Sequence, residues 1–222
     1  MILARIAELL APFLGSTSDQ RLTTSDLVNI STYIDLLQRW NSRINLTAIR
    51  DEEEIVTRHF GESLFAARQL FPLCSSVSPV VKGFEVADVG SGAGFPGIPI
   101  KLWAPGISLT LIESNNKKAT FLREVTRALT LTDVDIQNTR AESLRNVSFN
   151  VVTLRAVERF DSILPVASNL ISPEGRLALL IGQSQLPRAQ SILPTLLPTL
   201  TWPAIVPIPH SESRVLAIAT PT

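Results

Sequence analysis

Apolar side chains recur at helical spacing through much of the first seventy residues. From 25 to 40 they return every three or four positions, which predicts an amphipathic helix. A second helix is predicted from about Asp51 to Leu70, because Asp51 and Glu54 approximate a capping box at its start. The polar positions between these apolar residues predict one exposed face on each helix.

The opening stretch, 1–14, is also rich in apolar residues. Arg5 and Glu8 interrupt it, so it fits an amphipathic helix better than a signal peptide. Serines and prolines between 72 and 82 indicate a connection to a different architecture. We therefore expect an N-terminal helical extension over 1–72 and a second domain over 83–222.

Beyond residue 83 short apolar runs alternate with helical stretches. Strands at 84–89 and 107–113, with a helix between them, make a βαβ unit. Repeated alternation of this kind requires a largely parallel sheet with helices on both faces. The last two apolar runs have no clear helix between them and predict an antiparallel hairpin at one edge. Further strands are predicted at 134–139, 149–156, 176–182, 204–209 and 215–220, and further helices at 115–129 and 160–170.

Composition limits the possible partners without choosing one. The 222 residues allow one substantial core with an appendage. Twenty Lys and Arg balance 20 Asp and Glu, so any affinity for nucleic acid must come from local clusters of charge. Sixteen of the cations are arginines, whose guanidinium suits bidentate contacts to phosphate and guanine. The composition therefore permits RNA as a partner.

Cysteine usage and hydropathy bear on location. Cys74 is the only cysteine, which excludes an intrachain disulfide and a thiolate metal cluster. No uninterrupted apolar run approaches the length that spans a membrane. We expect a cytoplasmic protein with no metal site and no membrane contact.

A glycine-rich run, 88–97, follows the first predicted strand and precedes a helix. Its glycines, Gly90, Gly92 and Gly94, let the backbone approach a ligand where a Cβ would collide. In an open parallel sheet, this first strand-to-helix turn is a natural ligand site. The alternative is that the glycines serve tight packing alone.

Two acidic residues distinguish between possible ligands. Asp88 lies two residues before the first glycine, where the pyrophosphate of a dinucleotide would be repelled. S-adenosylmethionine carries an α-ammonium and a sulfonium, which a carboxylate favours. Glu113 ends the second strand, where it could accept hydrogen bonds from both ribose hydroxyls of an adenosine, although a surface or helix-capping carboxylate is the alternative. Together they predict S-adenosylmethionine as the cofactor.

Residues after the third and fourth strands extend this site. Backbone N–H groups of Ala141 and Glu142 lie where an adenine edge is expected, with an exposed turn as the alternative. Arg155 ends the fourth strand, where its guanidinium could donate to guanine O6 or anchor a phosphate. The alternative for Arg155 is a salt bridge to Glu142 or Glu158.

The absence of motifs required for other methyl acceptors narrows the choice of acceptor atom. The Asn-Pro-Pro-Tyr type of turn used in adenine-N6 chemistry is absent, and Cys74 lies too far upstream for cytosine-C5 chemistry. Guanine N7 already carries an in-plane lone pair, so its methylation needs no general base. Catalysis would then rest on positioning and electrostatics, with Arg155 as the catalytic candidate.

These features together resemble the RsmG family, also called glucose-inhibited division protein B, of bacterial small-subunit rRNA guanine-N7 methyltransferases. The resemblance covers most of the chain. A first block is what generic methyltransferases lack, and a second is the glycine-rich run 88–97. The first block comprises Trp40-Asn41, Asn45-Leu46-Thr47, Arg58-His59-Phe60 and Ser63-Leu64.

The resemblance implies a fold, a cofactor and an acceptor. The fold is the class I methyltransferase α/β fold, Rossmann-like, with a seven-stranded, mostly parallel sheet and an N-terminal helical extension. The donor is S-adenosylmethionine and the partner is 16S rRNA or the small ribosomal subunit. Gly90 and Phe95 would line the cofactor, with Glu113 at the ribose. Ala141 and Glu142 would hold the adenine, and Arg155 would meet the base.

The resemblance also suggests residues that face the RNA, and it has departures. Asn45, Arg58 and His59 are the candidates, although a histidine packed in the core is the alternative for His59. Ile181 stands where the family usually has lysine, and Glu62 where aspartate is common. Three rival hypotheses remain: a nucleotide-binding oxidoreductase, a methyltransferase acting on a protein or small metabolite, and a cofactor-binding homologue with weakened catalysis.

Overall fold

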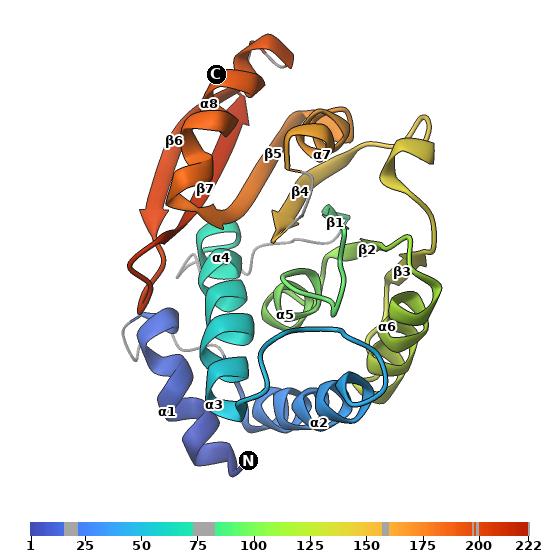
Figure 1. Ribbon diagram of the computed structural model, residues 1–222, viewed down its shortest axis with the longest axis vertical. Helices are drawn as coiled ribbons and strands as arrows, with labels where there is room; N and C mark the ends of the chain where they lie inside the picture. The colour runs from blue at the N-terminus through green and yellow to red at the C-terminus, as the bar shows by residue number, and fades with distance from the viewer. Residues whose placement is uncertain (16–21, 73–82, 157–159, 197, 199, 222) are drawn as a thin grey trace.

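A seven-stranded sheet forms the centre of the protein in a computed structural model (Figure 1). The structure describes residues 1–15, 22–72, 83–156, 160–196, 198 and 200–221. The strand order is β3-β2-β1-β4-β5-β7-β6. The strands are β1 (Glu85–Val89), β2 (Ser108–Ile112), β3 (Val134–Gln137), β4 (Phe149–Arg155), β5 (Ile171–Gly182), β6 (Leu200–Pro207) and β7 (Arg214–Pro221).

The first five strands are parallel and the last two are antiparallel. β1 lies between β2 and β4, with Val89 opposite Ile112 on one side and Leu154 on the other. β7 returns antiparallel between β5 and β6, so the predicted closing hairpin is confirmed. The parallel order reverses at β1 and β4, and ligand sites in such sheets lie at the carboxyl ends of the strands beside this reversal.

Helices cover both faces of the sheet, as the alternating pattern predicted (Figure 1). Alternate strand residues point to opposite sides, so Val86 joins one apolar core and Ala87 the other. The first core contains residues of the N-terminal helices, α5 and α6, and the second contains residues of α7 and α8. The helices are α1 (Leu3–Leu14), α2 (Thr24–Asn41), α3 (Glu52–Glu54), α4 (Glu62–Leu70), α5 (Gly97–Trp103), α6 (Asn116–Ala128), α7 (Phe160–Ser168) and α8 (Leu186–Leu196).

The helix predicted from 51 to 70 has an unpredicted middle. Asp51 caps it as expected, because its carboxylate accepts a hydrogen bond from the N–H of Glu54. Between α3 and α4, however, residues Ile55–Gly61 form a π-helical segment, η2. Gly61 packs so closely on Phe13 of α1 that a Cβ there would lie 2.6 Å from the ring. Periodicity indicates a helix but does not reveal this wider turn, which is frequent at functional sites.

The region after β4 departs further from the predicted elements. β5 begins at Ile171 and not at 176, and Gly175 allows its close contact with the backbone of β4. α8 was not predicted because its prolines argue against a helix, yet Pro187 lies in the first turn, where no N–H is needed. The predicted connection after Pro72, which contains Cys74, lies outside the described residues. No described helix combines the length and apolar character required to cross a membrane.

Candidate functional site

A cleft of about 640 Å³ opens where three parallel strands end. The residue that follows each of β1, β2 and β4 lines it, namely Gly90, Glu113 and Ala156. The remaining described residues that line the cleft are Leu46, Thr47, Ala48, His59, Ser91, Gly92, Ala93, Phe95, Ser114, Lys118 and Arg155.

The glycine-rich turn has both a packing role and an open side. All three predicted glycines have positive φ, at 71°, 57° and 86° for Gly90, Gly92 and Gly94. Gly94 serves packing, because a Cβ there would collide with the Tyr33 hydroxyl and Ile98. A Cβ at Gly92 would meet nothing nearer than the Gly90 carbonyl oxygen at 3.8 Å. Gly92 therefore exposes backbone to the cleft, where a ligand could approach it.

The two predicted carboxylates occupy different environments. Glu113 lines the cleft and accepts hydrogen bonds from the N–H groups of Gly92 at 2.9 Å and Asn115 at 2.7 Å. Asp88 is buried beneath the turn, where it accepts from the Thr153 hydroxyl at 2.8 Å and from the Gly97 N–H at 3.1 Å. Burial raises the pKa of Asp88 to about 6. Asp88 thus supports the turn from below and is not among the described residues that line the cleft.

The residues predicted to hold an adenine are not among the described residues that line the cleft. Ala141 and Glu142 begin a 3-10 turn after β3, and they line another cavity, of about 370 Å³. Asn138 holds this segment against the end of β2 by donating a hydrogen bond to the Glu113 carbonyl oxygen at 2.9 Å. Their role in adenine binding stays a prediction.

An aromatic stack connects the N-terminal helices to the cleft. Phe95 lies between Tyr33 of α2, at 5.2 Å between ring centroids, and His59, at 4.8 Å. The Tyr33 hydroxyl also donates a hydrogen bond to the Ala93 carbonyl oxygen in the glycine-rich turn. The sequence predicted Tyr33 only as part of an apolar helix face, and nothing in that pattern identified its contact with the turn.

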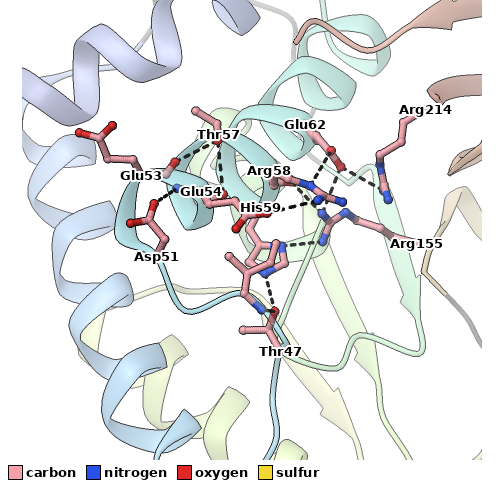
Figure 2. A network of polar contacts seen from close by, with 11 residues as sticks. Thr47, Asp51, Glu53, Glu54, Thr57, Arg58, His59, Glu62, Arg155 and Arg214 are labelled. Atoms are coloured by element: carbon pink, nitrogen blue, oxygen red, sulfur yellow. Dashed lines mark hydrogen bonds and ion pairs between the residues drawn. The ribbon is translucent and has the colours of Figure 1, made fainter. Parts of the chain in front are cut away.

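Arg155 lines the cleft and pairs with Glu62, which the sequence analysis did not identify as its partner. Its Nη2 donates to Glu62 Oε2 at 3.1 Å and to the Arg58 carbonyl oxygen at 2.7 Å, and its Nη1 lies 3.0 Å from His59 Nδ1 (Figure 2). The predicted alternative, a salt bridge to Glu142, is therefore wrong, and Glu158 lies outside the described residues.

Glu62 is the centre of a cluster of three arginines. Its side chain is only 3% exposed, and its carboxylate lies 3.0 Å from Arg214 Nη2 and 3.9 Å from Arg58 Nε, besides Arg155 (Figure 2). Figure 2 shows these guanidinium groups reaching it from the helix, from β4 and from β7. The three arginines outnumber this carboxylate, although the chain as a whole is neutral; Arg155 lines the cleft, whereas Arg58 and Arg214 line a second cavity.

His59 is buried, as the alternative of a packed histidine predicted, and it also lines the cleft. Its contact with RNA stays a prediction. Its Nε2 lies 2.8 Å from the Thr47 hydroxyl and its Nδ1 faces Arg155. Burial, and then the charges of Arg155, Arg58 and Arg214, lower the pKa of His59 to about 3. The imidazole is therefore neutral at pH 7.

The other predicted contacts to RNA lie farther away. Arg58 lines a second cavity, of about 610 Å³, between α1, η2 and the β6–β7 connection. None of the described residues that line that cavity follows a parallel strand, so we favour the cleft as the functional site. Asn45 is exposed in the segment after α2 and is absent from the described lining of both cavities. Among the described residues, no three His, Cys, Asp or Glu side chains are arranged to hold a metal ion.

Ile181, which stands where the resembling family usually has lysine, is only 2% exposed. It pairs with Val215 across β5 and β7 and belongs to the second apolar core. Its side chain is not among the described residues that line the cleft.

Comparison with known proteins decides the family. The sequence model described as "GidB: rRNA small subunit methyltransferase G" matches residues 26–191. The chain belongs to the rRNA small subunit methyltransferase G family. This family is the RsmG family that the sequence motifs resembled, so the chain is a methyltransferase of that family.

Curated members of the RsmG family are clearly similar over most of this chain. A protein of Xylella fastidiosa named ribosomal RNA small subunit methyltransferase G is 40% identical over 157 residues, covering 70% of this chain and 69% of that protein. A protein of the same name from Halorhodospira halophila is 40% identical over 157 residues, which cover 71% of this chain and 70% of that protein.

Solved structures show the same fold at low identity. Magnesium protoporphyrin IX methyltransferase from Synechocystis, solved with bound SAM, aligns with a TM-score of 0.65 and 14% identity over 90% of this chain and 98% of that chain. Ribosomal protein L11 methylase from Lactobacillus delbrueckii aligns with a TM-score of 0.60 and 17% identity, over 74% of this chain and 79% of that chain. The fold is therefore the predicted class I methyltransferase fold.

Proposed function

We propose that this RsmG-family protein transfers the methyl group of S-adenosylmethionine to N7 of a guanine in 16S rRNA. The proposal is supported by the family and by the chemistry of the cleft. The observation that carries it is that the described residues Thr47, His59 and Arg155, which line the cleft together, include no side chain able to act as a general base at neutral pH.

The other end of the cleft fits the cofactor. Gly92 leaves its backbone open to a ligand, and the Glu113 carboxylate is placed to accept hydrogen bonds from ribose hydroxyls. Ala141 and Glu142 would meet the adenine beyond the rim. When bound, S-adenosylmethionine supplies a methyl group on a sulfonium. Residues 90–95 would orient this methyl toward the end that contains His59.

The acceptor end suits a nucleophile that needs no deprotonation. Arg155 is a permanent cation and takes no proton. His59 has a pKa of about 3, and its Nδ1 lone pair faces Arg155. Exocyclic amines and hydroxyls would need a base here, whereas guanine N7 presents a free lone pair. Arg155 Nη2 donates to Glu62 and to the Arg58 carbonyl oxygen, Nη1 faces His59, and Nε is buried without a partner among the described residues. We propose that Arg155 acts on the base through His59.

The proposed partner is 16S rRNA, free or within the small ribosomal subunit. The arginine cluster around Glu62 supplies the local positive charge that the neutral chain lacks overall. We place the reaction in the cytoplasm, where this substrate is found.

The test uses purified protein, labelled donor and unmethylated small subunits. Borohydride reduction and aniline cleavage then map any N7-methylguanine to a single position of the RNA. Label that survives nuclease treatment would instead indicate a protein acceptor, and label at a position that resists this cleavage would contradict N7 as the target.

A further inference from the structure

The hydrogen bonds around His59 determine where its proton lies. Arg155 has only donors, so His59 Nδ1, 3.0 Å from Arg155 Nη1, must accept. A neutral imidazole carries one N–H, which is therefore on Nε2. Nε2 lies 2.8 Å from the Thr47 hydroxyl oxygen and donates to it (Figure 2). Arg155 thus selects the tautomer of His59, and the tautomer fixes a hydrogen bond to Thr47.

The Thr47 hydroxyl can offer the cleft only its hydrogen, as a hydrogen-bond donor. Its oxygen also accepts a hydrogen bond from the Ile49 N–H at 3.2 Å, so both of its lone pairs are used. Its own hydrogen has no acceptor among the contacts of the described residues. Thr47 lines the cleft beside His59 and Arg155. The side chain therefore presents a hydrogen-bond donor to the cleft and no acceptor.

We propose that Thr47 selects guanine by donating a hydrogen bond to its O6. This inference rests on the proposed function and adds a residue that chooses the base. Guanine shows two acceptors on its major-groove edge, N7 and O6, whereas adenine shows an amino group in place of O6. A hydroxyl that could accept would tolerate adenine, but Thr47 can only donate. Contact at O6 also leaves the N7 lone pair free for the methyl group.

His59 and Arg155 are positioning residues in this scheme. Neither touches the base, but together they prevent the Thr47 hydroxyl from turning its lone pairs to the cleft. Arginine suits this task because it has no acceptor and does not lose its proton at accessible pH. Glu62 in turn holds the Arg155 guanidinium in place through Nη2.

The first experiment pairs a change in the enzyme with a change in the base. Small subunits are reconstituted with rRNA that carries, at the target position, either guanine or 2-aminopurine, which keeps N7 and lacks O6. Thr47→Val removes the hydroxyl at nearly constant shape, and Thr47→Ser retains it. Thr120→Val is the matched control, because the Thr120 hydroxyl donates to the Asn116 carbonyl oxygen on the exposed face of α6.

The expected result is a loss of preference. Wild type, Thr47→Ser and Thr120→Val should all favour guanine over 2-aminopurine in kcat/KM by about tenfold to a hundredfold, the effect of leaving one donor without its partner. Thr47→Val should be slower on guanine by a similar factor and should favour neither base. A Thr47→Val enzyme that binds the donor normally and keeps the full preference would overturn the proposal.

A second measurement needs no substrate. The ¹⁵N chemical shifts of His59 in the whole protein should show a protonated Nε2 and an unprotonated Nδ1. Arg155→Met should change the proportion of the two neutral tautomers. A protonated Nδ1 in the wild type would refute the proposed orientation of Thr47. A wild-type enzyme that methylates another atom would end the proposed function instead, with the tautomer of His59 unaffected.

Discussion

His59 should make the folded protein sensitive to mild acid. The pKa of its imidazole is about 3 in the folded state against an ordinary value of 6.5, because the side chain is buried and faces three arginines. The unfolded chain therefore binds the proton more tightly than the folded protein. The stability that depends on neutral His59 is present above pH 6.5 and is lost as the pH falls toward 3.

The size of this effect follows from the two pKa values. Each pH unit below the pKa of His59 in the unfolded chain lowers the free energy of unfolding by about 1.4 kcal/mol, until the pH reaches its pKa in the folded protein. Between pH 7 and pH 5, His59 should lower the free energy of unfolding by about 2 kcal/mol. Asp88 acts in the opposite direction, because its raised pKa, about 6, favours the folded protein at low pH and this contribution is lost as the pH rises through 6.

The assay must separate these two groups. Urea unfolding at pH 5, 6 and 7 gives the free energy of unfolding of wild type and of His59→Gln, and Asp88 is present in both. Wild type should lose about 2 kcal/mol more than the variant on going from pH 7 to pH 5. His210, the only other histidine, is exposed, so His210→Gln is the control and should follow the wild type. Parallel curves for wild type and His59→Gln would refute the reasoning.

Substitutions of Glu62 and of Ile181 are tested by urea unfolding, each beside a control variant. Glu62→Gln should lower the free energy of unfolding by about 3 to 5 kcal/mol, since Arg155 and Arg214 would lose the carboxylate that balances their charges. Glu8→Gln removes an exposed partner of Arg5 and should leave the free energy of unfolding nearly unchanged, so equal losses in the two variants would contradict the buried pairing. Ile181→Lys, which buries an ammonium in the apolar core, should destabilise far more than Ile181→Val; a stable lysine variant with faster methylation would instead support the weakened-catalysis hypothesis.

The sequence alone determined the order of the elements and the location of the glycine-rich turn. Strand and helix periods depend on neighbours along the chain, so the strand positions of the βαβ unit and the glycine turn at 88–97 could be predicted from residues close together. Glu113 was found in the same way, because the residue after a parallel strand lies at a known edge of the sheet. The distinctive first block also identified the family.

Only the tertiary structure decided which of these groups meet. Arg155 is 93 residues from Glu62 in the chain, and no local pattern selects that carboxylate among twenty acidic residues. Asp88 faces inward to Thr153, and Ile181 is covered by the second core, because the packing of helices on the sheet sets which side of each strand is buried. The proton on His59 depends on Arg155, brought beside it by the same packing.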